Sequence, residues 1–485
     1  MLFRGFLYVL VFLLCVLVFA KVSSRALRQT VLLLGCYALY LTWGAWFAVV
    51  LLTSTVMNFL LGKWLQRRPS GLVLSTGILL NMALLGSFKY LPEIAPNIPL
   101  SSLQRFSHLA LQLGISFWTF QAMSYLFDLY RGEDLDPSFF EFALYMAFFP
   151  ITISGPICRM PEMLPQFRSQ GTTPAPDIGR GLCRVATGVL MMQLAQLLGQ
   201  GILAGDGINS GFDHVTRWSG TDVWCLALGY GLQLFLDFAG YSHIAIGAAQ
   251  ALGFTVPENF ARPFQSTNPS IFWTRWHMSL SFWIRDYVFL PLAVVRREMW
   301  WRNLVLVVSM ILFGVWHKAN VLFVLWGCYH GMLLVLHRQM QQLQRKFEWT
   351  PPAALWGAIS WLVTISLVSL GWIFFRANSL AEAQQMLSAV LSPASYLSHF
   401  FSGSLYALVM VLAVGYAIVL LVIEVLDRYL ISEVSSGHLC SGTVALMARS
   451  RWFWIPPLYL LALVTVVIVT HTHGADAAQF MYRKF

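Results

Sequence analysis

The apolar run NLVLVVSMILFGVWH (residues 303–317) is followed, after the single residue Lys318, by a second run, ANVLFVLWGCYHGMLLVLH (residues 319–337). Both runs are continuous rather than alternating, which favours helices over the strands of a membrane barrel. The whole chain shares this character, because 58% of its 485 residues are hydrophobic and only 11% are charged. Soluble domains average about 25% charged residues. In lipid, backbone polar groups must be paired within the protein, so we expect an all-α, polytopic integral membrane protein.

Further apolar runs set the expected number of helices. Residues 31–61 are too many for one span of about 20 residues, so they predict two spans or a re-entrant hairpin. The total is then about 11 to 14 transmembrane or re-entrant helices. The gaps between runs are too short to be linkers between folded domains, so residues 1–485 are expected to form a single membrane domain. The other runs lie at roughly 5–20, 71–89, 107–130, 139–154, 182–204, 222–252, 278–294, 353–376, 405–427 and 452–470.

The net charge of +10 is concentrated in short clusters between the apolar runs. Lysine and arginine are enriched in cytoplasmic loops, where they face anionic lipids. We therefore assign the clusters to the cytoplasm and to membrane lipids, and expect no nucleic-acid partner. The first run is interpreted as an uncleaved helix with its N-terminus outside the cytoplasm, because Lys21 follows it without a clear cleavage site. The clusters are Lys21, Arg25 and Arg28; Lys63, Arg67 and Arg68; Arg296, Arg297 and Arg302; and Arg338, Arg345 and Lys346.

Two aromatic-rich stretches concentrate polar side chains within the apolar regions. The first is FWTRWHMSLSFWIRDY (residues 272–287), and the second runs over residues 314–331 and holds His317 and His330. Ionisable groups at membrane depth are costly, so they are usually functional and usually face a cavity. A histidine needs only modest environmental shifts to gain or lose a proton near neutral pH. The two stretches therefore indicate the centre of an intramembrane enzyme.

The same stretches resemble the membrane-bound O-acyltransferase family, and most closely its bacterial branch that acylates cell-surface polymers. Proteins of alginate, peptidoglycan and cellulose acetylation and of teichoic-acid D-alanylation share the pattern. The resemblance runs in order from about Leu113 to His330, which places the motif-bearing core at about residues 107–340. Its other blocks are LGISFWTFQ (113–121), FFP (148–150), SGPI (154–157), LDFAGYS (236–242) and PENF (257–260).

The resemblance implies that His317, directly after Trp316, holds the position of the family's invariant histidine. Its role would be that of a general base that takes the proton from an acceptor hydroxyl, which is worth about 10²–10⁴-fold in rate. Lys318 stands where relatives usually have glycine, and it either narrows the chamber or supplies a cation near the acyl donor. His277 is implied to be a second catalytic residue that orients a substrate or His317.

The remaining polar and aromatic residues are expected to bind substrate or support the site. Arg285 and Asp286 are adjacent and do not share one helix face, so each is expected to pair elsewhere and hold helices together. Asp237 is expected to pair with an arginine, with Arg275 and Arg285 as the candidates. His330 lies about 20 Å beyond His317 along a straight helix, so it is expected to support the site by packing. The aromatic members of this set are Trp273, Trp276, Trp283 and Trp316.

Several other site types are not expected. His471 and His473 point apart in a helix, and although Asp476 is nearby, no third ligand is placed by spacing, so no metal is predicted. A glycine-rich phosphate loop and a Ser-His-Asp signature are not visible. A transporter would spread its polar residues over many helices or paired half-repeats, whereas here they gather in two neighbouring stretches.

The function implied by the resemblance is transfer of an acyl group, in the first place acetyl, from a cytoplasmic thioester toward an extracytoplasmic polysaccharide. The donor is acetyl-CoA or a carrier-protein thioester, and no bound cofactor is needed. A second periplasmic or extracellular acetyltransferase is expected to finish the transfer. The expected location is the bacterial cytoplasmic (inner) membrane. The alternatives are a lipid or protein acyltransferase of the same family and, in a different class, a membrane transporter.

Overall fold

The computed structural model describes residues 2–22, 24–94, 114–169, 177–202, 206–213, 217–347, 352–401 and 403–435. Within these ranges every regular element is helical, which confirms the all-α prediction. Eight of the described helices are long and apolar enough to cross a membrane. The predicted total of 11 to 14 also counts residues 452–470, which lie outside the described ranges, so that total stays a prediction. The eight spans are Ala45–Arg67, Gly71–Lys89, Ile178–Gln200, Gly220–Ala251, Met299–His317, Val321–Lys346, Leu355–Arg376 and Gly403–Val422.

The chain folds into two compact units, each assembled from three separate segments. The first unit contains residues 1–185, 242–261 and 274–297, and the second contains residues 186–241, 262–273 and 298–485. Two long helices, α11 (Ile178–Gln200) and α13 (Gly220–Ala251), contribute residues to both units. The expectation of one membrane domain over residues 1–485 stays a prediction.

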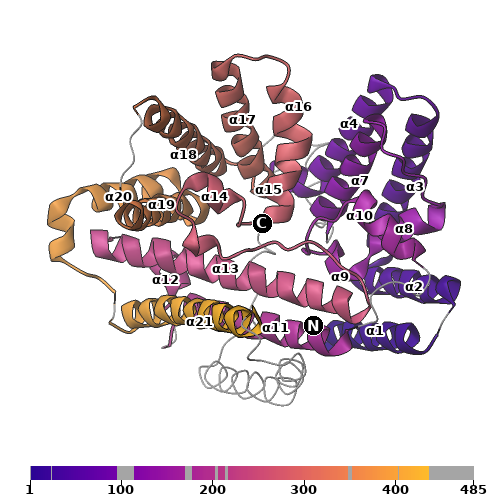
Figure 1. The fold of residues 1–485 in the computed structure, drawn as a ribbon, viewed down its shortest axis with the longest axis horizontal. Coiled ribbons are helices and arrows are strands. Elements are labelled where there is room, and N and C mark those ends of the chain that lie inside the picture. The colour runs from indigo at the N-terminus through magenta and orange to yellow at the C-terminus, as the bar shows by residue number, and fades with distance from the viewer. Residues whose placement is uncertain are drawn as a thin grey trace. The chain divides into compact units, whose positions relative to one another are not determined.

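The first unit is built mainly from the N-terminal helices, drawn in indigo to magenta in Figure 1. A glycine decides how residues 31–61 are divided, because Gly44 adopts φ +138° between α2 and α3 and breaks the run into two helices. This is the two-helix form of the prediction. The unit contains α1 (Leu2–Lys21), α2 (Arg25–Trp43), α3 (Ala45–Arg67), α4 (Gly71–Lys89), α5 (Leu91–Ile94), α7 (Ile115–Tyr130), α8 (Phe139–Ala147), α9 (Phe149–Thr152), α10 (Met160–Arg168), α15 (Met278–Ile284), η4 (Arg285–Phe289) and α16 (Leu290–Ala293).

Helix α7 is the buried centre of this unit, and α3 and α4 pack against it through glycines. A Cβ at Gly62 would lie 2.4 Å from the Tyr125 ring, and one at Gly77 would lie 2.6 Å from the Leu126 side chain. Helices α3 and α4 are also joined by a buried amide pair, in which Asn81 Nδ2 donates to Asn58 Oδ1 at 2.7 Å. Small residues at the crossings therefore let these helices approach closely, as is usual between membrane helices.

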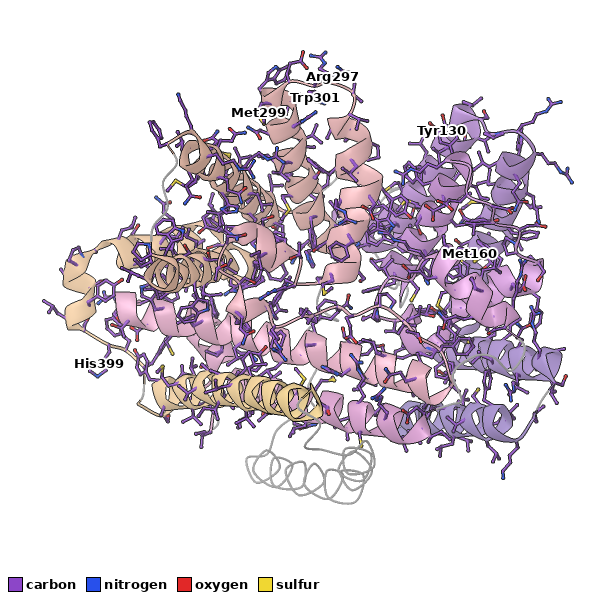
Figure 2. The ribbon with its side chains drawn as sticks, viewed as in Figure 1. Tyr130, Met160, Arg297, Met299, Trp301 and His399 are labelled. Atoms are coloured by element: carbon purple, nitrogen blue, oxygen red, sulfur yellow. The ribbon has the colours of Figure 1, made fainter. Side chains whose placement is uncertain are left out.

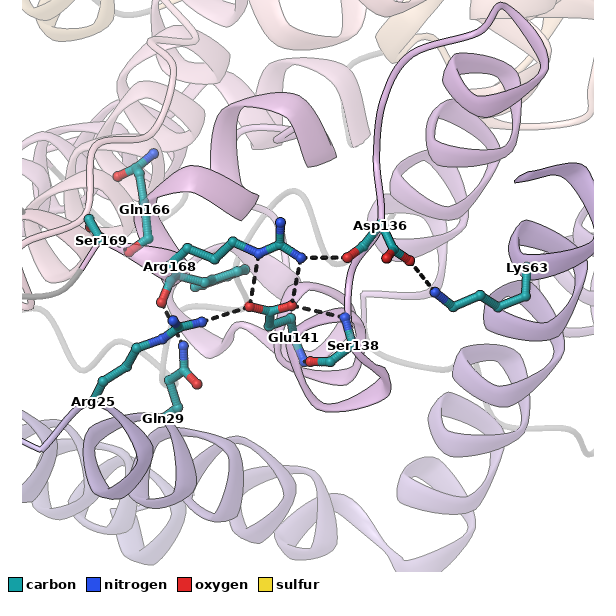
Figure 3. Close-up of polar contacts among 10 residues, drawn as sticks. Arg25, Gln29, Lys63, Asp136, Ser138, Glu141, Gln166, Arg168 and Ser169 are labelled. Carbon is teal, nitrogen blue, oxygen red and sulfur yellow. Dashed lines mark hydrogen bonds and ion pairs between the residues drawn. The ribbon is translucent and has the colours of Figure 1, made fainter. Parts of the chain in front are cut away.

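A charged network ties α2, α3, α8 and α10 together around Glu141 (Figure 3). Glu141 accepts hydrogen bonds from Arg25 at 2.7 Å and from Arg168 at 3.2 Å. It also closes a capping box with Ser138 at the start of α8. Arg168 continues the network to the backbone carbonyl of Asp136, whose carboxylate pairs with Lys63. The carboxylate of Glu141, 7% exposed, is thus held by two guanidinium groups.

Replacing Glu141 with glutamine should destabilise the protein by about 2–3 kcal/mol. This is below the roughly 3–5 kcal/mol for breaking a fully buried ion pair, because Arg25 and Arg168 are 34% and 45% exposed. Thermal unfolding of the purified protein in detergent measures the loss. Glu133→Gln removes an exposed carboxylate from the same region and should leave the melting temperature within about 1 °C.

The destabilisation should also depend on pH. Burial opposes ionisation of Glu141, but the hydrogen bonds from Arg168 and Ser138 outweigh it and hold the pKa of this carboxyl below its usual value. Because the folded pKa is lowered, the stabilisation is complete above the ordinary value of 4.5 and is lost as pH falls through the folded pKa. The difference between wild type and Glu141→Gln should therefore shrink in acid. A constant difference from neutral pH to about pH 3 would contradict this account.

The second unit centres on a helical hairpin, α17 (Met299–His317) and α18 (Val321–Lys346). Asn320 begins α18 by accepting a hydrogen bond from the Phe323 amide at 3.1 Å. The two helices meet backbone to backbone, since a Cβ at Gly314 would lie 2.1 Å from the Phe323 carbonyl oxygen and one at Gly327 would lie 2.3 Å from that of Met310. The other elements that lie wholly in this unit are α12 (Ile208–Asp213), η3 (Pro263–Gln265), α14 (Pro269–Trp273), α19 (Ala353–Arg376), α20 (Leu380–Leu391), η5 (Pro393–Leu397) and α21 (Gly403–Ser435).

Candidate active site

His317 is the last residue of α17 and is 7% exposed. Its ring stacks on Phe313 one turn earlier, with centroids 5.5 Å apart and planes 16° apart. Trp326 of α18 and Phe375 of α19 approach it edge-on, at 5.8 Å and 5.0 Å. Three helices therefore enclose the imidazole in aromatic side chains. Trp316 also contacts the ring, at 4.6 Å.

The same aromatic cluster contains His330, which is fully buried. Trp326 joins the two histidines, since its ring lies 4.9 Å from that of His330 as well as against His317. Trp273, from α14, contacts His330 at 5.3 Å and Trp326 at 5.7 Å. A Cβ at Gly371 would lie 2.5 Å from His330 Nε2, so the α19 backbone packs against this imidazole. The predicted residues Trp273, Trp316, His317 and His330 are thus brought together in the second unit.

Three members of this cluster carry buried polar atoms with no hydrogen-bond partner among the described residues. They are both ring nitrogens of His330 and the indole Nε1 atoms of Trp273 and Trp326. Leaving a buried donor or acceptor unsatisfied costs about 1–3 kcal/mol, so such groups call for an explanation. These unsatisfied atoms are available to form hydrogen bonds with a polar group of a bound molecule.

His277 lies in the first unit, at the start of α15, and is 2% exposed. Its backbone is left-handed, with φ +43° and ψ +52°, which is strained for a residue with a side chain. Hydrogen bonds on both sides hold it there: Met278 N donates to the Asn259 carbonyl at 2.9 Å, and Ala261 N donates to the Arg275 carbonyl at 3.0 Å. The Asn259 side chain also accepts from Ser279 Oγ at 2.6 Å. A strained backbone that its surroundings enforce is a common feature of functional sites.

Replacing His277 with glycine should leave the protein about 1 kcal/mol more stable than replacing it with alanine. Both variants lose the imidazole, but only glycine adopts a positive φ without a steric penalty. Both should transfer acyl groups more slowly than wild type, with a smaller loss than for His317→Ala. Melting temperatures and turnover of the two variants, measured side by side, check this. Equal stabilities of the two variants would show that the backbone at residue 277 is not strained. A loss of turnover as deep as that of His317→Ala would identify His277, and not His317, as the general base.

A second network in the first unit surrounds Asp286 and Tyr287, in the π-helical turn η4. Asp286 pairs with Arg159 at 2.7 Å and with Arg285 at 2.6 Å. The Tyr287 hydroxyl donates to Asp128 at 2.8 Å, and its ring lies between Arg131 and Arg159, at 5.1 Å and 5.0 Å from their guanidinium carbons.

The structure corrects one expectation here. Arg285 was expected to pair elsewhere because adjacent residues of a regular α-helix do not face each other, but it pairs with Asp286. The wider π-helical turn over residues 285–289 changes that geometry. Asp286 also pairs with Arg159, the N-cap residue of α10. Trp283 is buried nearby, and its indole donates to the Phe120 carbonyl at 3.1 Å.

Other predicted residues are placed without being joined to either cluster. Trp276 packs edge-on against Phe260 at 5.2 Å, and Lys318 caps the end of α17. Asp237 is 6% exposed in the middle of α13 and belongs to the second unit, whereas Arg275 and Arg285 belong to the first, so their pairing stays a prediction. The same holds for a shared chamber between His277 and His317.

Sequence reasoning assigned no site role to several members of the two clusters. Trp326 and Phe375 enclose His317, and Asp128, Arg131 and Arg159 surround Tyr287. Asp128, Arg131 and Arg159 lie within the span from about Leu113 to His330 that carried the family resemblance, which was the available signal. Among the described residues no group of three or more metal-ligating side chains occurs; His471, His473 and Asp476 lie outside them.

Both clusters lie within a region of the chain that matches a known protein family. The sequence profile of the membrane-bound O-acyltransferase family matches residues 100–376, which is more than half of the chain. The chain belongs to the membrane-bound O-acyltransferase family. This confirms the resemblance, and the protein is an acyltransferase embedded in a membrane.

Individual relatives of this O-acyltransferase are bacterial. A probable alginate O-acetylase of Pseudomonas syringae pv. tomato is 31% identical over 436 residues, covering 86% of this chain and 80% of the relative. A peptidoglycan O-acetyltransferase of Helicobacter pylori is 32% identical over 396 residues, covering 74% and 73%. A teichoic acid D-alanyltransferase of Bacillus subtilis is 29% identical over 280 residues, covering 55% and 69%.

Proposed function

We propose that this O-acyltransferase takes an acetyl group from cytoplasmic acetyl-CoA and passes it across the bacterial cytoplasmic membrane for O-acetylation of an extracytoplasmic polysaccharide. The observation that carries the proposal is His317, a buried imidazole that aromatic side chains from three helices enclose. Relatives whose names describe alginate and peptidoglycan O-acetylation support acetyl as the group and a glycan as the acceptor.

The reaction needs one base and no bound cofactor. A ring nitrogen of His317 takes the proton of the acceptor hydroxyl while the hydroxyl oxygen attacks the thioester carbonyl carbon. The C–S bond breaks, the new C–O bond becomes the ester, and the proton passes to the departing thiolate. Proton transfer of this kind contributes about 10²–10⁴-fold in rate.

The aromatic cluster suits this chemistry because it excludes water from a thioester that water would otherwise hydrolyse. The Nε1 atoms of Trp273 and Trp326 are donors, and His330 offers a donor and an acceptor. These atoms would bind the polar end of a substrate beside His317. His330 is then a substrate-positioning residue.

His330→Phe should reduce acetyl transfer by about tenfold while keeping or raising thermal stability. Phenylalanine preserves the aromatic packing and removes two nitrogens that no described protein group satisfies, a change that is near neutral or stabilising. Steady-state kinetics and thermal unfolding of one preparation check both halves. Unchanged turnover together with a lower melting temperature would make His330 a packing residue only.

The direction of transfer across the membrane is inferred from the positions of the basic clusters. The basic clusters at residues 21–28, 63–68 and 296–302 face the cytoplasm under the positive-inside rule, which puts the N-terminus outside. The charged donor would bind on that side, and the acceptor would approach from the other. A second, extracytoplasmic acetyltransferase would then carry the acetyl group to the polymer.

Purified protein with acetyl-CoA labelled in its acetyl group tests the proposal. We expect release of free CoA thiol that requires an acceptor hydroxyl, and transfer to polysaccharide only when the second protein is added. Longer acyl-CoA substrates should react more slowly. A preference for a long acyl chain with a lipid or protein acceptor would contradict this proposal. It would identify the protein as a lipid or protein acyltransferase of the same family.

A further inference from the structure

The α17–α18 hairpin carries a second feature, a groove of about 280 Å³ at the end where α17 begins and α18 ends. Met299 at this end of α17 is labelled in Figure 2. The α18 residues of the groove are spaced i, i+3, i+4 and i+7, so they share one face of that helix. The residues that line it are Met299, Arg302, Arg338, Gln341, Gln342 and Arg345.

Three arginines therefore converge on one small groove. No carboxylate among the described residues pairs with Arg302, Arg338 or Arg345. Arg338 is oriented by Asn303, whose side-chain oxygen accepts from it at 3.2 Å, and Gln342 Nε2 lies 3.9 Å from the Met299 sulfur. The lining of the groove thus carries three positively charged side chains and no carboxylate, with amide donors beside them. Arginine forks match the oxygens of phosphate groups.

The surroundings of the groove match those of a membrane interface. Both helices are long and apolar enough to cross a membrane, and they expose apolar side chains such as Leu312 and Leu336 beyond the groove. Trp300 and Trp301 stand at the same end of α17, with Trp300 55% exposed. Tryptophans gather where lipid head groups begin.

We propose that this groove binds the phosphate head group of an anionic phospholipid. Basic pockets between membrane helices, at the cytoplasmic ends, recognise such head groups. Position separates this site from the acyl donor's reacting end: Arg302 precedes His317 by 15 residues of one helix, or about 22 Å along its axis. The groove would anchor the hairpin that carries His317 in the anionic leaflet, and it does so whether or not the proposed transfer reaction is correct.

The double variant Arg302→Gln/Arg345→Gln tests the site in the full-length protein. Both side chains are exposed, and Arg338 keeps its bond to Asn303, so folding should be retained. The matched control, Arg67→Gln/Arg68→Gln, removes the same charge from another exposed basic cluster. Delipidated protein in neutral detergent is titrated with phosphatidylglycerol or with phosphatidylcholine of identical chains, and bound lipid is counted by native mass spectrometry.

Wild type and the control should prefer phosphatidylglycerol, and the groove variant should bind it at least about tenfold more weakly, since each basic residue contributes about 1 kcal/mol. Arg302→Lys/Arg345→Lys should retain part of that preference. An equal loss of phosphatidylglycerol binding in the control would show that the lipid responds to total positive charge and not to this groove, and would overturn the site. Displacement of phosphatidylglycerol by CoA, with loss of CoA binding in the groove variant, would assign the groove to the donor and overturn the lipid proposal.

Discussion

His317→Ala should lower acyl transfer by at least about 100-fold, the low end for removal of a general base. The substitution takes away the imidazole that the aromatic rings of Phe313, Trp326 and Phe375 enclose. Those rings keep their own contacts, with Phe313 and Trp326 centroids 5.8 Å apart and Trp326 and Phe375 5.4 Å apart. The loss should therefore appear in turnover and not in expression or elution volume.

An exposed histidine provides the control for this variant. His399, labelled in Figure 2, lies on the surface, and His399→Ala should transfer acyl groups at the wild-type rate. Rates of thiol release from acetyl-CoA, measured with equal amounts of folded protein, compare the two. If His317→Ala keeps more than about a tenth of wild-type turnover, His317 is not the base.

Gly314→Ala should cost about 3 kcal/mol of stability and most of the activity. The added methyl group would lie 2.1 Å from the Phe323 carbonyl oxygen, so the backbones of α17 and α18 must separate. Overpacking typically costs about 1–3 kcal/mol, and a clash with backbone has little room to relax. Gly314 is one turn before His317, so the separation would also displace the imidazole from Trp326.

A second glycine isolates the effect of the clash. A Cβ at Gly357, in α19, would meet nothing within 4 Å. Gly357→Ala should therefore keep wild-type activity and raise stability slightly, because alanine is favoured over glycine in a helix by about 1 kcal/mol. Thermal unfolding and turnover of both variants test the pair. Wild-type stability in Gly314→Ala would mean that the hairpin is not packed backbone to backbone.

The long helices could be predicted from the sequence because lipid demands continuous apolar runs. Residues 303–317 and 319–337 became α17 and α18, and residues 31–61 divided at Gly44. The placement of His317 at a helix end followed from the same pattern. Family resemblance supplied the chemical role proposed for His317, which hydropathy alone does not indicate.

Breaks within apolar runs could not be predicted from hydropathy, because they depend on backbone geometry. Residues 139–154 divide into α8 and α9 at Phe148, and residues 278–294 pass through a π-helical turn that lets Arg285 meet Asp286. The aromatic side chains that enclose His317 could not be predicted from the sequence either. Phe375 lies 58 residues away along the chain, and only the packing of α19 on α18 brings it within 5.0 Å.

The central claim is that acetyl groups enter from the cytoplasmic side and leave toward the other side through His317. Proteoliposomes test it with acetyl-CoA either sealed inside or supplied outside. The orientation of the protein in them is first determined with an impermeant thiol label on Arg67→Cys. The account predicts that acetyl-CoA is consumed only on the side where position 67 is exposed, that acetylated product appears on the opposite side, and that His317→Ala abolishes both. Equal consumption from both sides, or product retained on the donor side, would contradict it.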